Sequence, residues 1–167
     1  MVDRHTRNQA KNQRSHAFFY CLCAVLLGSI TILPAQAADD LKLRPGVSLT
    51  QDIDNGFPIT GTNLEDCKIA TTTPTLLFFG ASGDLNTNRQ AKRFVYLYKK
   101  IAPKALKYIV VDIDHPANED AKGLIKTHYH GYIPAEVLLD KSGKVVWSHD
   151  GEIEFNLLKA QVDKIVE

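Results

Sequence analysis

The segment Thr75–Arg89, TLLFFGASGDLNTNR, most constrains the fold of this chain. It begins with an uninterrupted apolar run, Thr75–Phe79, of the kind that forms a central strand covered on both faces. Gly80 and Gly83 bracket the exit from this strand, and from about Thr87 apolar residues recur at helical spacing. The segment therefore predicts a buried strand, a tight turn and the start of an amphipathic helix.

From residue 74 onward, strand patterns and helix patterns alternate. Short apolar runs are separated by longer segments whose apolar residues follow the helical period. Because crossover strands pair in parallel and hairpin strands antiparallel, this order predicts an α/β fold with a central mixed β-sheet and helices on both faces. The expected strands are Thr75–Phe79, Tyr108–Ile113, Ala135–Leu139 and Lys144–Ser148, and the expected helices are about Thr87–Ile101, Glu119–Thr127 and Phe155–Ile165.

The part before the central strand is less regular. Residues 38–61 form a turn-rich extension, in which Val47–Leu49 is expected to make a short edge strand. A short helix is expected over Thr62–Ile69, because its first residue and Glu65 have the spacing of a capping box. This helix would carry Cys67.

The first 37 residues have the pattern of a secretory signal peptide. Four basic residues open the chain, Ala17–Leu33 is an uncharged apolar run, and Ala35–Ala37 is an A-x-A cleavage signal. We expect cleavage after Ala37 and a periplasmic location in a Gram-negative bacterium. An uncleaved membrane anchor is the alternative, because a run of 17 residues is near the lower limit for a span. The expected organisation is a signal peptide over 1–37, an extension over 38–61 and a folded domain over 62–167.

Charge and cysteine content limit the partners of the mature chain. Removing the leader takes away four of the 20 lysine and arginine residues and one of the 19 acidic residues, which leaves a net charge of about −2. Because no basic stripe suits a phosphate backbone, we expect no nucleic-acid partner. Contact with a membrane is expected only through the leader, if it is uncleaved. Only Cys67 follows the leader, so the mature chain cannot close an internal disulfide.

The central strand and turn resemble the active-site segment of thioredoxin-like proteins of the thioredoxin and TlpA types. In that family the strand ends in a pattern similar to F-G-A-S-W-C-x-x-C, and Phe79–Ser82 matches its first four residues. Gly83 stands at the tryptophan position, and Asp84 and Thr87 stand at the two cysteine positions. Tyr132–Pro134 resembles the family's cis-proline segment. The chain thus resembles an exported thioredoxin-like protein that lacks the C-x-x-C cysteines.

The resemblance covers about residues 63–167 and implies a thioredoxin-like fold. Dithiol exchange needs a thiolate and a second, resolving thiol, and both positions have lost their sulfur. The family's buried carboxylate is also replaced, by Phe78. We therefore expect a non-catalytic binding, chaperone-like or assembly module that needs no cofactor. Its groove, for a protein or peptide partner in the cell envelope, is expected to consist of Gly83, Asp84, Thr87, Ile133 and Pro134.

Asp84 is expected to cap the helix that follows it, because the positive end of the helix dipole favours an anion. Two alternative functions remain open. Cys67 is the candidate for a single-cysteine thiol–disulfide exchange factor, against which stands a buried and inert thiol. His128 and His130 are candidate metal ligands, against which stand surface histidines at a helix end.

A second resemblance concerns the same turn. Phe79–Leu85 is similar to the G-A-S-G-D-L turn that holds NADP in glucose-6-phosphate dehydrogenases, and Asp112 would then take the place of a ribose-binding acid. The length of the mature chain, the expected export and the hairpin-plus-helix ending all favour the thioredoxin-like interpretation.

Overall fold

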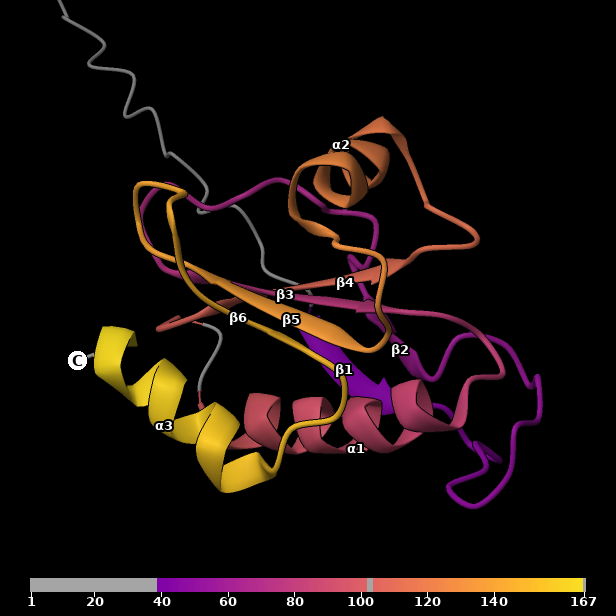
Figure 1. Ribbon diagram of the computed structural model, residues 1–167. Coiled ribbons are helices and arrows are strands. Elements are labelled where there is room, and N and C mark those ends of the chain that lie inside the picture. The colour runs from indigo at the N-terminus through magenta and orange to yellow at the C-terminus, as the bar shows by residue number, and fades with distance from the viewer. Residues whose placement is uncertain (1–38, 102–103, 167) are drawn as a thin grey trace, which may run out of the picture. The chain divides into compact units, whose positions relative to one another are not determined.

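The computed structural model describes residues 39–101 and 104–166. The expected signal peptide, residues 1–37, lies outside the described residues. The described chain forms two sheets, a larger one with the strand order β4-β3-β5-β6 and a smaller one of β1 and β2 (Figure 1). The elements are β1 (Asp39–Leu43), β2 (Ile59–Thr62), β3 (Thr75–Gly80), α1 (Leu85–Lys100), β4 (Lys107–Asp112), α2 (Glu119–His128), β5 (Ala135–Leu139), β6 (Val145–Asp150) and α3 (Phe155–Val166).

β3 is an inner strand of the larger sheet, as its unbroken apolar sequence predicts. It pairs in parallel with β4, from Thr75 opposite Lys107 to Gly80 opposite Asp112, and α1 makes the crossover between them. All the residues of β3 are buried. Their side chains alternate between two hydrophobic clusters, one on each face of the sheet, which explains why the strand is apolar without interruption.

β5 runs antiparallel to β3, which differs from the parallel pairing expected after a crossover helix. Ala135 pairs with Phe79, and Leu139 pairs with Thr75. The end of β4 and the start of β5 therefore lie at the same end of β3, so the α2 connection leaves that end and returns to it. β6 then pairs with β5 through the predicted turn at Asp140–Gly143. This mixed pairing differs from the parallel sheet of a dinucleotide-binding domain.

Helices cover both faces of the larger sheet (Figure 1). α1 and α3 lie on one face, where the rings of Phe78 on β3 and Phe94 on α1 have centroids 5.1 Å apart. α2 lies on the other face, where Ala121 and Leu124 join the cluster that contains Phe79. The predicted fold class, a mixed α/β sheet between two helical layers, is confirmed. No helix in the described ranges is long and apolar enough to cross a membrane.

The extension contributes to the core. The strand predicted at Val47–Leu49 is wrong, because Ser48 begins a turn in which its Oγ accepts a hydrogen bond from the Gln51 N–H at 3.0 Å. Strands form instead on either side of this turn, as the antiparallel pair β1 and β2. Leu41 on β1 and Ile59 on β2 are each 1% exposed and belong to the cluster between the sheet and α1.

The predicted helix over Thr62–Ile69 is also wrong. Thr62 is the last residue of β2, and Asn63 has a φ of 57°, a left-handed conformation that a right-handed helix does not contain. One turn follows, closed by a hydrogen bond of 3.0 Å from the Asp66 N–H to the Asn63 carbonyl. Cys67 therefore lies on an irregular segment that leads into β3.

We expect Leu41→Ala to lower the free energy of unfolding by about 2–5 kcal/mol, because it removes fully buried methyl groups and leaves a cavity. Urea denaturation followed by the fluorescence of Trp147 measures the change. Leu157→Ala is the matched control, since the same truncation of a side chain that is 59% exposed should cost less than about 0.5 kcal/mol. Equal effects of the two substitutions would show that β1 adds nothing to the core.

Candidate functional site

Asp84 caps the amino terminus of α1, as predicted. Its backbone is extended, with φ −79° and ψ 124°, and its Oδ1 accepts a hydrogen bond from the Thr87 N–H at 2.6 Å. The cap satisfies one of the N–H groups that a helix leaves without an internal partner. The helix dipole favours the carboxylate by about a further 0.3–1 kcal/mol. Asp84 thus serves as a structural anion at the position where the family has its thiolate.

Thr87, at the second lost cysteine position, lies inside the fold. Its side chain is fully buried, and its Oγ1 accepts a hydrogen bond from the Ala81 N–H at 3.4 Å. Its methyl group lies so close to Gly80 that a Cβ added there would be 2.4 Å from Thr87 Cγ2. Among the residues expected to form the groove, Thr87 therefore supports the turn and offers no surface to a partner.

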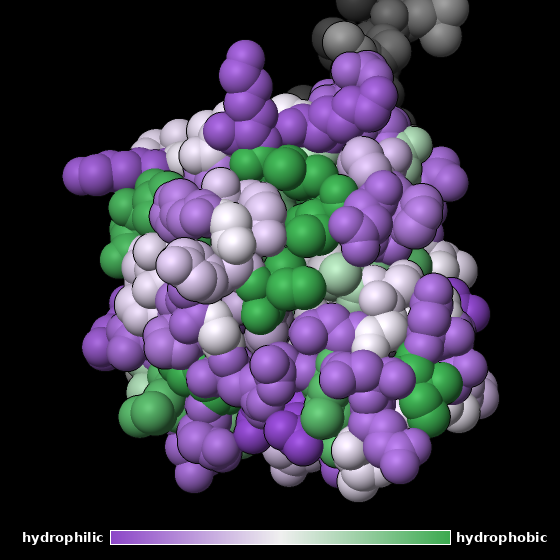
Figure 2. All heavy atoms as spheres, turned by 45° about the vertical axis from the view of Figure 1, so that its right-hand side comes forward, coloured by the Kyte–Doolittle hydropathy of each residue, from purple (hydrophilic) through white to green (hydrophobic). Residues whose placement is uncertain are grey.

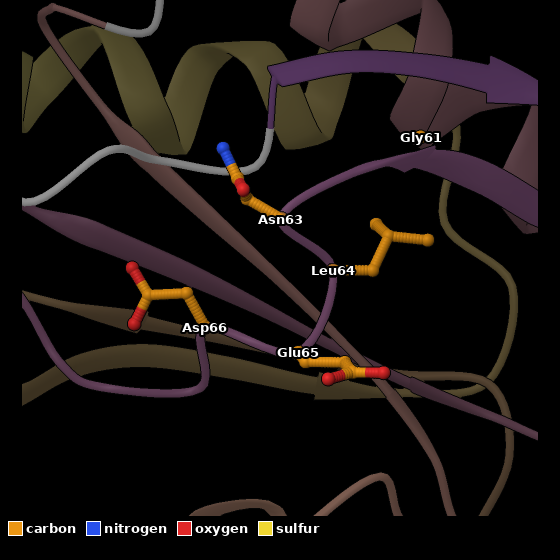
Figure 3. Close-up of a pocket in the computed structure, with 5 residues that line it drawn as sticks. All are labelled: Gly61, Asn63, Leu64, Glu65 and Asp66. Atoms are coloured by element: carbon orange, nitrogen blue, oxygen red, sulfur yellow. The ribbon is translucent and has the colours of Figure 1, made fainter.

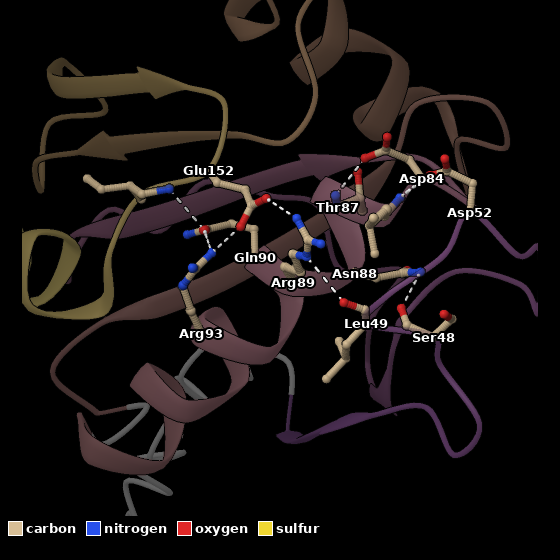
Figure 4. A network of polar contacts seen from close by, with 12 residues as sticks. Ser48, Leu49, Asp52, Asp84, Thr87, Asn88, Arg89, Gln90, Arg93 and Glu152 are labelled. Atoms are coloured by element: carbon tan, nitrogen blue, oxygen red, sulfur yellow. Dashed lines mark hydrogen bonds and ion pairs between the residues drawn. The ribbon is translucent and has the colours of Figure 1, made fainter.

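A loop of the extension, residues 48–54, lies beside this turn (Figure 4). Asp52 Oδ1 accepts a hydrogen bond from the Leu85 N–H at 2.8 Å, so a second carboxylate serves the amino terminus of α1. Gly83 has a φ of 77°, and a Cβ added to it would lie 3.1 Å from the Cβ of Asp54. Close packing and backbone conformation both favour glycine at the family's tryptophan position.

Two side chains of α1 hold the backbone of the 48–54 loop. Asn88 Nδ2 donates to the Ser48 carbonyl at 3.0 Å, and Arg89 Nε donates to the Leu49 carbonyl at 3.2 Å (Figure 4). The loop therefore contacts the first two turns of the helix through backbone groups and one carboxylate. Sequence reasoning missed this loop, because no local pattern indicates which helix a turn-rich segment will contact.

The loop before β5 lies at the same end of the sheet as the turn after β3, because Phe79 pairs with Ala135. The Ile133–Pro134 peptide bond is cis, in agreement with the resemblance. Pro134 is buried, and its carbonyl accepts a hydrogen bond from the Gly151 N–H at 2.7 Å. Pro134 is thus fixed to the end of β6 and forms the base of this loop.

Ile133 and Tyr132 are the accessible part of the same loop. Tyr132 is 68% exposed, and Ile133 is half-buried. Within the ranges that the structure describes, neither the N–H nor the carbonyl of Ile133 has a hydrogen-bond partner. Unpaired backbone groups of this kind can pair with an added extended peptide. The structure therefore brings Ile133, Gly83 and Asp84 to one end of the sheet with accessible surface.

Glu136 is a buried carboxylate that sequence reasoning missed. It is fully buried within the otherwise apolar strand β5, AEVLL, and it pairs directly with Phe78. Directly paired residues project from the same face of a sheet, so Glu136 lies beside Phe78 on the face that α1 covers. The resemblance placed the family's carboxylate at the position of Phe78, and here a carboxylate reaches that region from the neighbouring strand. A single acid inside an apolar strand was the available signal.

The carboxylate of Glu136 has no hydrogen-bond partner among the described residues, and neither has Nε2 of Gln90 on α1. Gln90 Oε1 accepts hydrogen bonds from the Ile153 N–H at 3.0 Å and from Arg93 Nη1 at 3.2 Å (Figure 4). Burial raises the pKa of Glu136 to about 8, although the Gln90 side chain and the charge of Arg93 oppose part of this rise. Glu136 is therefore mainly protonated and neutral at pH 7.

Cys67 is 3% exposed. Burial raises the pKa of its thiol to about 11, and the nearby charges of Asp66 and Asp120 contribute to the rise. Asp66 forms an ion pair of 2.7 Å with Lys107, whose side chain is 2% exposed. A hollow of about 540 Å³ is lined by Asp66 and other residues of segment 61–66 (Figure 3), and a smaller one of about 240 Å³ borders Cys67. Because its pKa is raised and its side chain is buried, the Cys67 thiol is protonated and nearly inaccessible at neutral pH.

The candidate metal ligands differ in their surroundings. His128, in the last turn of α2, is 9% exposed, and burial together with the neighbouring His130 lowers its pKa. The His130 side chain is 59% exposed, and its Nδ1 lies 4.0 Å from Asp150 Oδ1. In the described part of the chain, no group of three or more histidine, cysteine or acidic side chains is placed to hold a metal ion.

The sequence matches no protein-family model, and it matches no curated protein. Chains of solved thioredoxins resemble it in structure. Thioredoxin-2 of the malaria parasite, a component of its protein secretion machinery, is 25% identical, with a TM-score of 0.47 over 55% of this chain and 82% of that chain. The thioredoxin pre-protein of Schistosoma mansoni is 15% identical, with a TM-score of 0.47 over 57% and 81%. Thioredoxin of Malassezia sympodialis is 15% identical, with a TM-score of 0.49 over 59% and 81%.

The fold of this chain is thioredoxin-like on the ground of its own topology. The strand order β4-β3-β5-β6, with one parallel and two antiparallel pairings, places the β3–α1 turn beside the cis-prolyl loop. Helices on both faces complete the architecture.

We expect Glu136 to make the fold less stable as pH rises from about 4.5 to about 8. In this range the unfolded chain releases the proton of Glu136 while the folded chain keeps it, so the free energy of unfolding falls, by up to about 5 kcal/mol. Glu136→Gln removes this titration and keeps the shape of the side chain. Urea denaturation of both proteins from pH 5 to pH 8 should show the variant gaining stability relative to the parent. Parallel pH profiles would contradict the assignment.

Proposed function

We propose that this chain is an exported thioredoxin-fold protein that binds a protein or peptide partner in the cell envelope and performs no dithiol chemistry. The partner would pair with the accessible end of the sheet formed by Gly83, Asp84 and Ile133, above the buried supports Thr87 and Pro134. The role is that of a binding, chaperone-like or assembly module.

The observation that carries this proposal is that the N–H and carbonyl of Ile133 have no hydrogen-bond partner among the described residues. These two groups lie two residues before the start of β5, where an extended peptide can add main-chain hydrogen bonds without new secondary structure in the protein. The exposed side chain of Tyr132 adds a large amphipathic surface beside them. Strand addition draws its affinity from main-chain groups, so it suits a partner that presents an extended segment.

The chemistry of the turn supports binding over exchange. Asp84 is engaged as a helix cap and Thr87 is buried, so neither position offers a nucleophile or a resolving group. Asp52 adds a second negative charge at the same helix terminus. A thiolate in place of Asp84 would still meet the carboxylate of Asp52, which disfavours its formation.

The proposed location is supported by the sequence of the leader. A basic opening, an uncharged apolar run of 17 residues and the A-x-A signal at Ala35–Ala37 favour export and cleavage after Ala37. Contact with the membrane would occur through the leader if it were retained. The proposed partner is a protein or peptide of the cell envelope, to which the chain would be exported.

Site-specific photo-crosslinking tests the binding site. A benzoylphenylalanine residue at position 132, replacing an aromatic side chain that is 68% exposed, should yield a discrete adduct in intact cells. The same residue at position 157, where the leucine is 59% exposed on α3, is the matched control and should yield none. In the isolated complex, the amide of Ile133 should exchange its hydrogen at least tenfold more slowly than in the free protein. Equal adducts at both positions, or an unprotected Ile133, would refute the site.

Alkylation of Cys67 separates this proposal from the single-cysteine alternative. A rise in thiol pKa from 9 to about 11 lowers the thiolate fraction at pH 7 about 100-fold, and burial blocks access further. We therefore expect iodoacetamide to modify Cys67 at least 100-fold more slowly in the folded chain than in urea. Mass spectrometry of the Cys67 peptide distinguishes it from Cys21 and Cys23. Comparable rates in the two conditions would favour exchange chemistry through Cys67.

A further inference from the structure

The outer surface of α1 carries two neighbouring hollows that share two side chains. One hollow, of about 340 Å³, lies between α1, Leu49 and Phe155. The other, of about 630 Å³, lies between α1 and β1. Lys92 and Tyr96 line both hollows, so they form a ridge with a depression on each side. We call these two side chains and the two hollows the α1 outer surface.

The charged side chains of α1 are all basic. α1, LNTNRQAKRFVYLYKK, has basic residues in both halves and no acidic residue, although the mature chain is nearly neutral. Solvent-exposed helix faces more often mix both signs, because opposite charges one turn apart stabilise each other. Positive charges near the amino terminus of a helix also oppose its dipole. The helix therefore concentrates positive charge where helix stability does not require it.

Carboxylates from other segments neutralise only part of this charge. Arg93 pairs with Glu152 at 2.6 Å and with Glu154 at 3.1 Å, and Arg89 lies 3.4 Å from Glu152. These pairs hold the two arginines at the rim of the first hollow (Figure 4).

Two exposed lysines line the hollows. Lys92 on the ridge and Lys99 in the second hollow have no carboxylate within ion-pair distance in the described residues. Both side chains are exposed, so a partner can reach their ammonium groups. The surface therefore offers two exposed cations about two helical turns apart, and neither is paired with a carboxylate of the described residues.

Aromatic side chains form the apolar part of the surface. Tyr96 is 46% exposed, and its ring packs against that of Phe155 with the centroids 4.7 Å apart. Lys100 Nζ lies 5.2 Å from the centroid of the Tyr96 ring. Exposed aromatic rings beside cations are typical of protein–protein contact sites, because one side chain offers both apolar area and a polar edge.

We propose that the α1 outer surface docks an acidic peptide segment of a partner protein, with carboxylates at Lys92 and Lys99 and an apolar side chain in a hollow beside Tyr96. A peptide fits this surface better than a nucleic acid, because a peptide can present carboxylates to the exposed lysines and also an apolar side chain to a hollow lined partly by Leu49 and Phe155. This surface uses residues other than Ile133 and the turn after β3, so it is independent of the function proposed above.

Fluorescence anisotropy of a labelled peptide tests this surface on the purified full chain. The probe is a peptide of three Glu-Glu-Phe repeats, compared with peptides in which lysine replaces each glutamate or serine replaces each phenylalanine. We expect the Glu-Glu-Phe peptide to bind at least tenfold more tightly than either control at low ionic strength. The affinity should fall in about 0.5 M salt, because salt screens exposed charges.

Matched variants locate the binding. Lys92→Glu and Tyr96→Ala should each weaken the Glu-Glu-Phe peptide about tenfold. Two control variants should leave the affinity for this peptide within twofold. Lys126→Glu makes the same change of charge at an exposed position of α2, on the other face of the sheet, and Leu157→Ala truncates an exposed side chain on α3. Equal losses for Lys92→Glu and Lys126→Glu would overturn the proposal, since they would indicate net charge alone. Equal competition by a single-stranded oligonucleotide would overturn it in favour of a general polyanion surface.

Discussion

The positive end of α1 is the feature on which much of this structure depends. A helix leaves its first N–H groups without internal partners, and here Asp84 and Asp52 each accept one of them. In a dithiol thioredoxin the same field favours a thiolate. Because Asp52 belongs to the 48–54 loop, capping the helix also fastens the extension to α1, while β1 and β2 bury Leu41 and Ile59 against the same helix. Asp84, Thr87 and the 48–54 loop thus pack together around the positions at which the resemblance places the cysteines.

The interior beneath α1 contains buried polar side chains. Among the described residues, neither the Glu136 carboxyl group nor the amide nitrogen of Gln90 has a hydrogen-bond partner, and burying unpaired polar groups costs free energy. A neutral carboxyl group costs less than a charged one, which is why burial raises the pKa of Glu136. Phe78 directly opposite contributes apolar packing where the family has its acid. With Asp84 engaged as a cap, no thiol at this turn exchanges a proton with Glu136.

The two proposed contact surfaces differ in how they would recognise a partner. Every extended peptide offers the same main-chain groups to Ile133, so pairing there gives affinity with little discrimination between partners. The α1 outer surface offers exposed lysines and an exposed aromatic ring, which select for charge and for apolar side chains. A partner that used both would bind through the end of the sheet and one flank of the same helix. The ion pairs of Arg93 with Glu152 and Glu154 hold that flank in a fixed arrangement.

Local pattern was sufficient for the elements whose periodicity is strong. The run Thr75–Phe79, the hairpin turn and the cap at Asp84 depend on neighbouring residues, so they could be predicted locally, and the alternation of strand and helix patterns predicted the fold class. Pairings between distant segments were decided only by the tertiary structure: the direction of β5, the β1–β2 sheet, and the contact of the 48–54 loop with α1. The capping-box spacing at Thr62 wrongly predicted a helix, because Thr62 is the last residue of β2. The buried Glu136 was missed, because its strand lies beside Phe78 only in the folded sheet.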